Sequence, residues 1–308
     1  MTDSHTPRRI ALLSPGIMGA AVGAALVRAG LGVTTCLAGR SAASRARAES
    51  GGLALADDLA GLLAGADLVL SVVPPAAALA TAEAVAAAMT AGGGPRQRPA
   101  YADLNAVSPA TARRIAAVIA AAGAPFIDGG IVGGPPAAGS AGPRIYVSGA
   151  ATGAMGALDG MGFAVMDLGP EVGRASALKM VYAALTKGTN SLHTAVMLAA
   201  EQLAVTEPLV AELAHSQAAA LASLDGAIPR LPADAGRWIG EMEEIAATFR
   251  AAGVTGDFHD GAAWVFQRLA ESPYGEETRE TMDHGRSRAE TVRIVAGALQ
   301  RPAKGEMS

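Results

Sequence analysis

Two glycines three residues apart near the amino terminus are placed to bind phosphate. Gly16 and Gly19 follow the apolar run at residues 10–13 and open an alanine-rich segment with helical character. In dinucleotide-binding loops, one such glycine lets backbone amides approach a pyrophosphate and the other lets the helix pack closely on the strand. The amides of Ile17 and Met18 would then face the pyrophosphate from the helix N-terminus. This segment is therefore predicted to bind a dinucleotide.

The loop departs from the usual pattern at its first glycine position, where the sequence has Ser14 followed by Pro15. A serine can still form the turn at the end of a strand, and proline fixes its own φ. The loop also follows a predicted strand, opens a helix and lies in a series of βαβ units. We therefore predict that it binds the cofactor despite the departure.

The end of the second predicted strand indicates which nicotinamide cofactor is bound. NAD sites place an acidic residue there to bind the ribose hydroxyls. This sequence instead has Arg40, Ser41 and Arg45, and arginine and serine side chains suit a 2′-phosphate. The prediction is NADP(H) in preference to NAD(H). In the alternative interpretation, Ser41 caps the next helix and Arg40 is solvated.

A second group of polar residues lies on one long helix predicted for residues 171–205. At about 100° per residue, five positions lie on one side of this helix. They are Ser176, Lys179, Ala183, Thr186 and Asn190, with Tyr182 and His193 on the flank. A lysine in a cleft can stabilise negative charge on a substrate oxygen and donate a proton. Lys179 is therefore the predicted proton-handling residue, with Tyr182 as its rival, and a solvated helix face is the alternative.

Short β-like runs alternate with helical runs up to about residue 170, and this alternation predicts how the two groups are positioned. Such βαβ units form a parallel sheet with helices on both faces. Residues 128–144 are rich in glycine and predict a long loop. Beyond residue 170 the sequence is helical. We expect a Rossmann-type α/β domain, 1–170, followed by an all-α domain, 171–308, joined by the long helix.

Composition excludes several classes of protein. The 308 residues carry 24 Lys and Arg against 28 Asp and Glu, a net charge of -4 without a basic tract, so no nucleic-acid partner is expected. No apolar run approaches the roughly 20 residues that span a bilayer, and the start lacks a signal-peptide pattern, so a cytoplasmic protein without a membrane partner is expected. The one cysteine, Cys36, is predicted to be a buried thiol.

Several motifs in order resemble the β-hydroxyacid dehydrogenase and 6-phosphogluconate dehydrogenase superfamily, which includes the imine reductases. They are "PGIMGAAVGAALVRAG", "SVVPP", "DLNAVSP", "DGGIVGGPPAAGSAG" and "ALKMVYAALTKG", and the tail resembles a branch whose helical C-terminal domain has no assigned function. The resemblance implies cofactor contacts at Val73, Pro74 and Asn105, and a substrate loop at Val132, Gly133 and Gly134. It also implies that Lys179 is the catalytic lysine.

The sequence departs from this family at groups that bind a carboxylate or lie near the nicotinamide. Asn105 and Ala106 stand where the dehydrogenases have Ser-Thr, and Val132 replaces the serine of their substrate loop. Ala183 replaces an asparagine four residues after the lysine, and Glu243-Glu244 replaces a Lys-Asp pair. The resemblance therefore implies the reaction type more closely than the substrate.

The helical region offers further candidates. Asn190 and Trp238 could contact substrate, although Trp238 also suits core packing, and Arg237 precedes Glu241 by the spacing of a helical ion pair. His259 lies between two aspartates, but without a second histidine at ligand spacing we predict no metal site.

These observations predict an NADPH-dependent oxidoreductase that moves hydride between nicotinamide and a small carbonyl or hydroxy compound. An imine reductase is the alternative within this class, and a nucleotide-binding protein without catalysis is the alternative outside it. A helix of about 50 Å with an apolar surface exceeds what one helical domain covers, and in the resembled family it lies between subunits, so a homodimer is expected.

Overall fold

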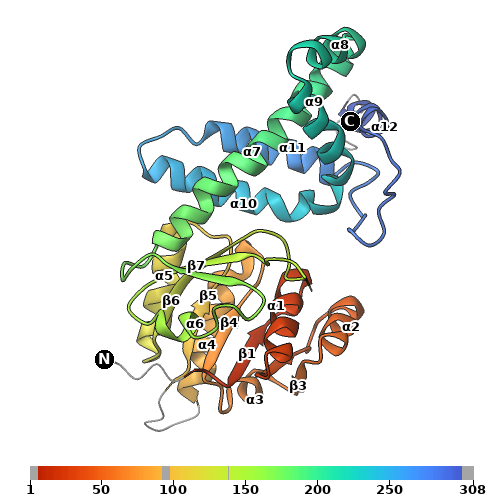
Figure 1. The fold of residues 1–308 in the computed structure, drawn as a ribbon. Coiled ribbons are helices and arrows are strands. Elements are labelled where there is room, and N and C mark those ends of the chain that lie inside the picture. Colours follow the sequence, from red (N-terminus) through yellow and green to blue (C-terminus); the bar gives the residue numbers. More distant parts are fainter. Residues whose placement is uncertain (1–5, 92–97, 138, 300–308) are drawn as a thin grey trace, which may run out of the picture. The chain divides into compact units, whose positions relative to one another are not determined.

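The computed structural model describes residues 6–91, 98–137 and 139–299 (Figure 1). The chain divides into two compact units, residues 1–180 and 181–308. The division falls within the long helix α7 (Arg174–Gln202), later than the predicted boundary at residue 170, because the first turns of α7 contact the sheet of the first unit.

The first unit is built on one eight-stranded sheet with the order β3-β2-β1-β4-β5-β6-β7-β8. Neighbouring strands are parallel, except that β6 and β7 are antiparallel. The strands are β1 (Arg9–Leu13), β2 (Gly32–Cys36), β3 (Ala54–Ala56), β4 (Leu68–Ser71), β5 (Ala100–Asp103), β6 (Phe126–Val132), β7 (Arg144–Ser148) and β8 (Ala164–Asp167). This is the predicted Rossmann-type architecture.

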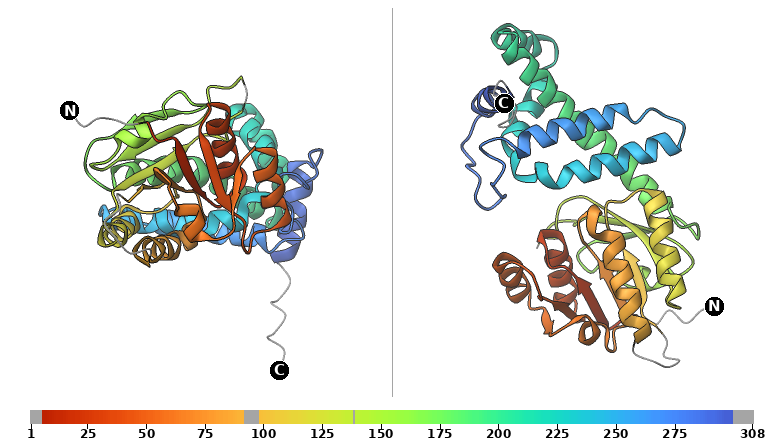
Figure 2. Two further views of the ribbon diagram at one scale, coloured as in Figure 1. Left: turned by 90° about the horizontal axis from the view of Figure 1, so that it is seen from below. Right: turned by 180° about the vertical axis from the view of Figure 1, so that it is seen from behind.

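Helices cover both faces of this sheet (Figure 2). One core contains Val22 and Leu26 of the first helix, and the other contains Ala82 and Ile115 from two later helices. The four residues of β4 are buried, as expected for a central parallel strand covered on both faces. The helices are α1 (Ile17–Arg28), α2 (Ala42–Ser50), α3 (Leu59–Leu63), α4 (Pro75–Ala91), α5 (Pro109–Ala121) and α6 (Gly153–Gly156).

The prediction of a loop from residue 128 was wrong at its start, because β6 continues to Val132. Its glycines are explained by close neighbours on both faces of the strand. A Cβ at Gly129 would lie 2.5 Å from Leu104 Cδ2, and one at Gly130 would lie 2.7 Å from Lys179 Cβ. Glycine here permits close packing and does not mark a loop.

The predicted helix over residues 171–205 is shorter at both ends, since α7 has 29 residues. Gly173 precedes it with φ 102°, and Ala204 follows it with φ 56°. Both are left-handed conformations, which a right-handed helix cannot include.

The described residues of the second unit form helices and connecting segments, without a strand. After the greater part of α7 come α8 (Thr206–Ser216), α9 (Ala218–Ala227), the 3-10 helix η1 (Ile228–Arg230), α10 (Pro232–Ala251), α11 (Asp257–Ala270) and α12 (Arg288–Leu299). Helices α10 and α11 lie side by side (Figure 1). Their contact buries Met242, Ile245, Phe266 and Leu269. In the part of the chain that the structure describes, no helix has the length and apolarity needed to cross a bilayer.

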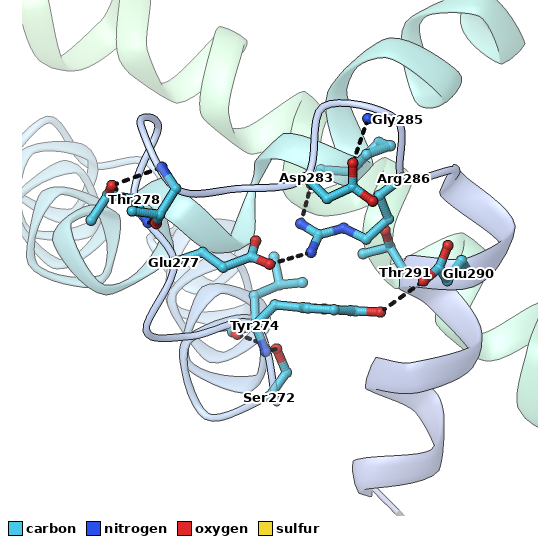
Figure 3. Close-up of polar contacts among 12 residues, drawn as sticks. Ser272, Tyr274, Glu277, Thr278, Asp283, Gly285, Arg286, Glu290 and Thr291 are labelled. Carbon is cyan, nitrogen blue, oxygen red and sulfur yellow. Dashed lines mark hydrogen bonds and ion pairs between the residues drawn. The ribbon is translucent and has the colours of Figure 1, made fainter.

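The segment between α11 and α12 is fixed by one buried arginine (Figure 3). The Arg286 guanidinium donates to Glu277 Oε1 and to the carbonyl of Pro229, both at 2.6 Å. It also lies 3.8 Å from the centre of the Tyr274 ring. These contacts tie the irregular segment to η1, so it belongs to the packed structure of the second unit.

Candidate cofactor and active site

The loop after β1 has the geometry that a dinucleotide requires. Ser14 adopts φ 70°, the left-handed conformation that glycine provides in the usual pattern, so the serine makes the same turn. A Cβ at Gly19 would lie 2.5 Å from the Ser14 carbonyl oxygen, which explains why that position is glycine. Gly16 is the N-cap of α1 and supplies no side-chain acceptor.

The space in front of this loop is open. A Cβ at Gly16 would meet no atom within 4 Å. The first amides of a helix have no partners within the helix, so those of Ile17 and Met18 can donate to an anion. The residues present therefore fit the pyrophosphate of a dinucleotide.

A cavity of about 450 Å³ is lined by residues at the ends of β1 and β2 and by helices α3 and α4, and Ser14 of the loop also lines it. Arg40 lines it, is exposed and forms no ion pair within the described part of the chain. Cys36 also lines it, half-buried with Sγ 3.7 Å from the Asp57 carbonyl oxygen, so the prediction of a buried thiol was wrong. Cys36 is the last residue of β2, so its side chain lies at the strand end that borders this cavity.

The other two residues predicted to bind the 2′-phosphate lie at the start of α2, Ser41 as its N-cap and Arg45 within it. The Ser41 hydroxyl caps this helix by accepting a hydrogen bond from the Ser44 amide at 3.3 Å. Capping was the alternative interpretation of Ser41. Arg45 lies one turn further along and is exposed. Of the three candidates, Arg40 is the one that lines the cavity.

Asn105 forms hydrogen bonds that hold the end of β4 and the residues after it. Its Oδ1 accepts a hydrogen bond from the Val73 amide at 2.6 Å, and its Nδ2 donates to Ser71 Oγ at 3.1 Å. The Asn105 side chain is buried, so it fixes the loop after β4 to the end of β5. Val73 and the exposed Pro74, both predicted cofactor contacts, are held by this bond where α4 begins.

Asp103 is the last residue of β5, two residues before Asn105, and is fully buried. Burial, together with the smaller effect of the charge on neighbouring Asp128, raises the pKa of Asp103 to about 7. Hydrogen bonds from the amide and side chain of Asn105 oppose the shift. The Asp103 carboxyl group therefore titrates near neutral pH.

The first unit brings Lys179 to the predicted substrate loop. Lys179 Nζ donates a hydrogen bond to the Ile131 carbonyl oxygen at 2.8 Å. The next residues are Val132, which is buried, and then Gly133 and Gly134, which are exposed. Gly133 has φ 118°, so the chain turns sharply away from β6 at this point. Lys179 and the strand end that leads into this loop, 48 residues apart in sequence at Ile131, are therefore neighbours.

Sequence reasoning missed Asp128 and Ser148, which contact the start of α7 from β6 and β7. A signal was present, because Asp128 interrupts the apolar run at residues 126–132. A buried carboxylate is costly unless several donors surround it.

The remaining candidates lie in the second unit. Tyr182 is exposed, and Asn190 is half-buried. Trp238 packs edge-on against Phe266 at 5.2 Å between ring centres, which is the core-packing alternative. The predicted pairing of Arg237 with Glu241 was wrong. Arg237 binds Asp234 at 2.8 Å, while Glu241 binds Lys187 of α7 at 2.5 Å.

His259 packs edge-on against Phe249, and burial lowers its pKa. In residues 6–91, 98–137 and 139–299, no group of three or more His, Cys, Asp or Glu side chains is arranged to hold a metal ion. The functional geometry described above is thus that of a dinucleotide-binding α/β unit followed by a helical unit.

Comparison with known families agrees with this architecture. Residues 9–161 match the NAD binding domain of 6-phosphogluconate dehydrogenase, and residues 200–269 match a domain of unknown function, DUF1932. The chain belongs to the β-hydroxyacid dehydrogenase and 6-phosphogluconate dehydrogenase-like superfamily of NAD(P)-dependent dehydrogenases and reductases, in the branch with this C-terminal domain. No curated protein matches the chain.

Solved structures share the fold over nearly the whole chain. A conserved hypothetical protein from Sinorhizobium meliloti is 25% identical, with a TM-score of 0.64 over 94% of this chain and 96% of that one. The 3-hydroxyisobutyrate dehydrogenase of Mycobacterium tuberculosis is 19% identical, with a TM-score of 0.64 over 96% and 100%. A reductive aminase from Aspergillus terreus, solved in complex with NADPH4, cyclohexanone and allyl amine, is 21% identical, with a TM-score of 0.52 over 96% and 100%.

Proposed function

We propose that the protein transfers hydride between NADPH and a small carbonyl or hydroxy compound, with Lys179 handling the proton. The observation that carries this proposal is the contact of Lys179 Nζ with the Ile131 carbonyl oxygen, beside the Gly133–Gly134 turn. The bound nicotinamide would supply the hydride chemistry. The chain would supply the loop amides for the pyrophosphate and Arg40 for the 2′-phosphate.

Lys179 is suited to the proton transfer by its chemistry and its surroundings. Reduction of a carbonyl builds negative charge on oxygen, and an ammonium group within about 3 Å stabilises this charge and can donate a proton. The ammonium has three N–H donors, and the bond to Ile131 fixes the direction of one of them. The side chain is half-buried, which strengthens its electrostatic effect.

Reduction of an imine is the second candidate, and two residues favour it. Val132 lies where the dehydrogenases have a serine for the substrate carboxylate, and Ala183, one turn after Lys179, lies where they have an asparagine. An apolar side chain cannot bind a carboxylate, so a less polar substrate fits these positions better.

Turnover with a defined panel tests the proposal. Oxidation of NADPH is followed with small 2- and 3-oxo acids, simple ketones and cyclic imines as separate classes. We expect turnover of at least one class, and the class identifies the substrate chemistry. Tight NADPH binding without turnover of any class would instead indicate a nucleotide-binding protein without catalysis.

The predicted cytoplasmic location stays a prediction.

We also propose that α7 pairs with a second copy of this chain. Val181, Leu185 and Leu192 are 57%, 69% and 62% exposed, and their spacing places them on one face of the helix with Val196. An exposed apolar face of this kind marks an interface, and a two-fold pair is the commonest oligomer. Light scattering at micromolar concentration should give the dimer mass for the wild type and the monomer mass for Leu185→Glu. A monomeric wild type would contradict the proposal.

A further inference from the structure

Asp128 receives hydrogen bonds from the start of α7 on both of its carboxylate oxygens. Its Oδ2 accepts from the amides of Gly173 at 2.9 Å, Ala175 at 3.1 Å and Ser176 at 3.1 Å. Its Oδ1 accepts from the Ser176 hydroxyl at 2.5 Å. Ser148 Oγ donates to Oδ2 at 2.8 Å and is itself 3.1 Å from the Ala175 amide. All these partners are donors, so the site fits a carboxylate.

The same strand also positions the lysine one turn further along the helix. Side chains two residues apart on a strand point to the same face, and residues three apart on a helix are neighbours. On β6 and α7, Asp128 therefore lies against Ser176, and Gly130 lies against Lys179. At Gly130 a Cβ would lie 2.7 Å from Lys179 Cβ, and one residue later the Ile131 carbonyl accepts from Nζ.

We propose that Asp128 is a positioning residue that sets the location of Lys179 by fixing the first turn of α7 against β6. The carboxylate satisfies amides that have no partner within the helix, and its negative charge is favoured at a helix N-terminus. With this turn fixed, the side chain of Lys179 lies along Gly130 and reaches Ile131. The importance of this position for catalysis rests on the proposed function, whereas the positioning itself does not.

Chemical labelling of lysine measures the positioning without any substrate. The sequence has three lysines, Lys179, Lys187 and Lys304. The full-length protein is treated with a trace of acetic anhydride at pH 8, and mass spectrometry gives the labelling rate of each peptide. Lys187 is the internal reference because it is paired with Glu241 in the second unit. We expect Asp128→Asn to raise the rate of Lys179 relative to Lys187 about threefold or more, because release from Ile131 exposes the amine.

Two further variants make the result specific. Ser176→Ala removes one of the hydrogen bonds to Asp128 and should give a smaller rise in the same ratio. Asp167→Asn is the matched control, because Asp167 also accepts bonds from a hydroxyl, that of Thr152, and from an amide, that of Gly169, but does so at the end of β8. It should leave the ratio unchanged.

The proposal is overturned if folded Asp128→Asn keeps the wild-type ratio of the Lys179 labelling rate to the Lys187 labelling rate. Equal acceleration of both lysines would leave this ratio unchanged and would also overturn it. Should Asp128→Asn fail to fold, an unchanged ratio in Ser176→Ala overturns it. Activity separates this proposal from the proposed function. If Asp128 acts through Lys179, Asp128→Asn adds no further loss of kcat in a Lys179→Ala background. If Lys179→Ala keeps full activity, the catalytic role fails, and the labelling result still decides the positioning.

Discussion

The two units use their polar side chains in different ways. In the first unit, polar side chains bind main-chain atoms at the ends of strands, as buried Asn105 binds the Val73 amide and half-buried Lys179 binds the Ile131 carbonyl. In the second unit, Lys187 and Arg286 pair with the acidic side chains of Glu241 and Glu277, and Arg286 also donates to a main-chain carbonyl. The first arrangement shapes loops, whereas the second holds helices together.

This difference indicates where the chemistry lies. Side chains that fix loops leave other main-chain donors, such as the first amides of α1, directed at open space. Side chains that pair with one another are already neutralised and have little capacity left for a ligand. We therefore expect substitutions in the first group to change binding and turnover, and substitutions in the second group to change mainly stability.

The largest effect is expected from Lys179→Ala. Groups that act as a general acid or base contribute about 10²- to 10⁴-fold, so kcat should fall by about that factor. The affinity for NADPH should stay within a few-fold, because Lys179 lies at β6 and not at the loop after β1. Steady-state kinetics and cofactor titration give both values.

Tyr182→Phe is the companion variant for this prediction. Tyr182 follows Lys179 by three residues on α7 and is its rival for the proton transfer. Near-normal kcat in Lys179→Ala together with lost activity in Tyr182→Phe would assign the role to the tyrosine. The protein would then resemble an imine reductase more closely.

A smaller effect, on stability alone, is expected from Glu241→Gln. This change leaves the Lys187 ammonium buried without its carboxylate, which should lower the free energy of unfolding by about 2–4 kcal/mol. Glu271→Gln breaks the more exposed pair with Arg268 and should cost less than about 1 kcal/mol. Urea unfolding measures both. A large change in NADPH affinity in Glu241→Gln would contradict the division between the units.

The pH dependence of stability tests the raised pKa of Asp103. The pKa of Asp103 is raised to about 7 in the folded protein, above its ordinary value of 3.8. Its contribution to stability is therefore fully present below pH 4 and is lost as the pH rises through about 7, by a few kcal/mol at most. Asp103→Asn should remove this loss. Identical pH profiles of unfolding for wild type and variant would show that Asp103 does not titrate in this range.

Much of the first unit could be predicted from sequence because its signals are local. The first strand is followed directly by a turn and then by Gly16 and Gly19. Each of these features can be recognised from the residues next to it in the sequence. The strand at residues 126–132 could not be predicted in the same way. Its glycines are explained by Leu104 and Lys179, which approach it from distant parts of the chain.

The ion pairs of the second unit show the same limit. Helical spacing alone favoured a pair between Arg237 and Glu241, but Lys187 of another segment takes Glu241 and leaves Arg237 to Asp234. Helical periodicity also placed Lys179 among polar neighbours, yet its contact with Ile131 depends on the packing of α7 on β6. Periodicity identifies the face of a helix and not its partner.

Titration of both cofactors into wild type and Arg40→Ala tests the central claim most directly. Arg40 lines the cavity and forms no ion pair in the described part of the chain, so it is expected to bind the 2′-phosphate. Loss of such a charge-assisted contact costs about 1.5–3 kcal/mol, or on the order of 10- to 100-fold in affinity. The wild type should prefer NADPH, and Arg40→Ala should lose this preference while keeping its affinity for NADH. Equal affinities of the wild type for NADPH and NADH would contradict the account.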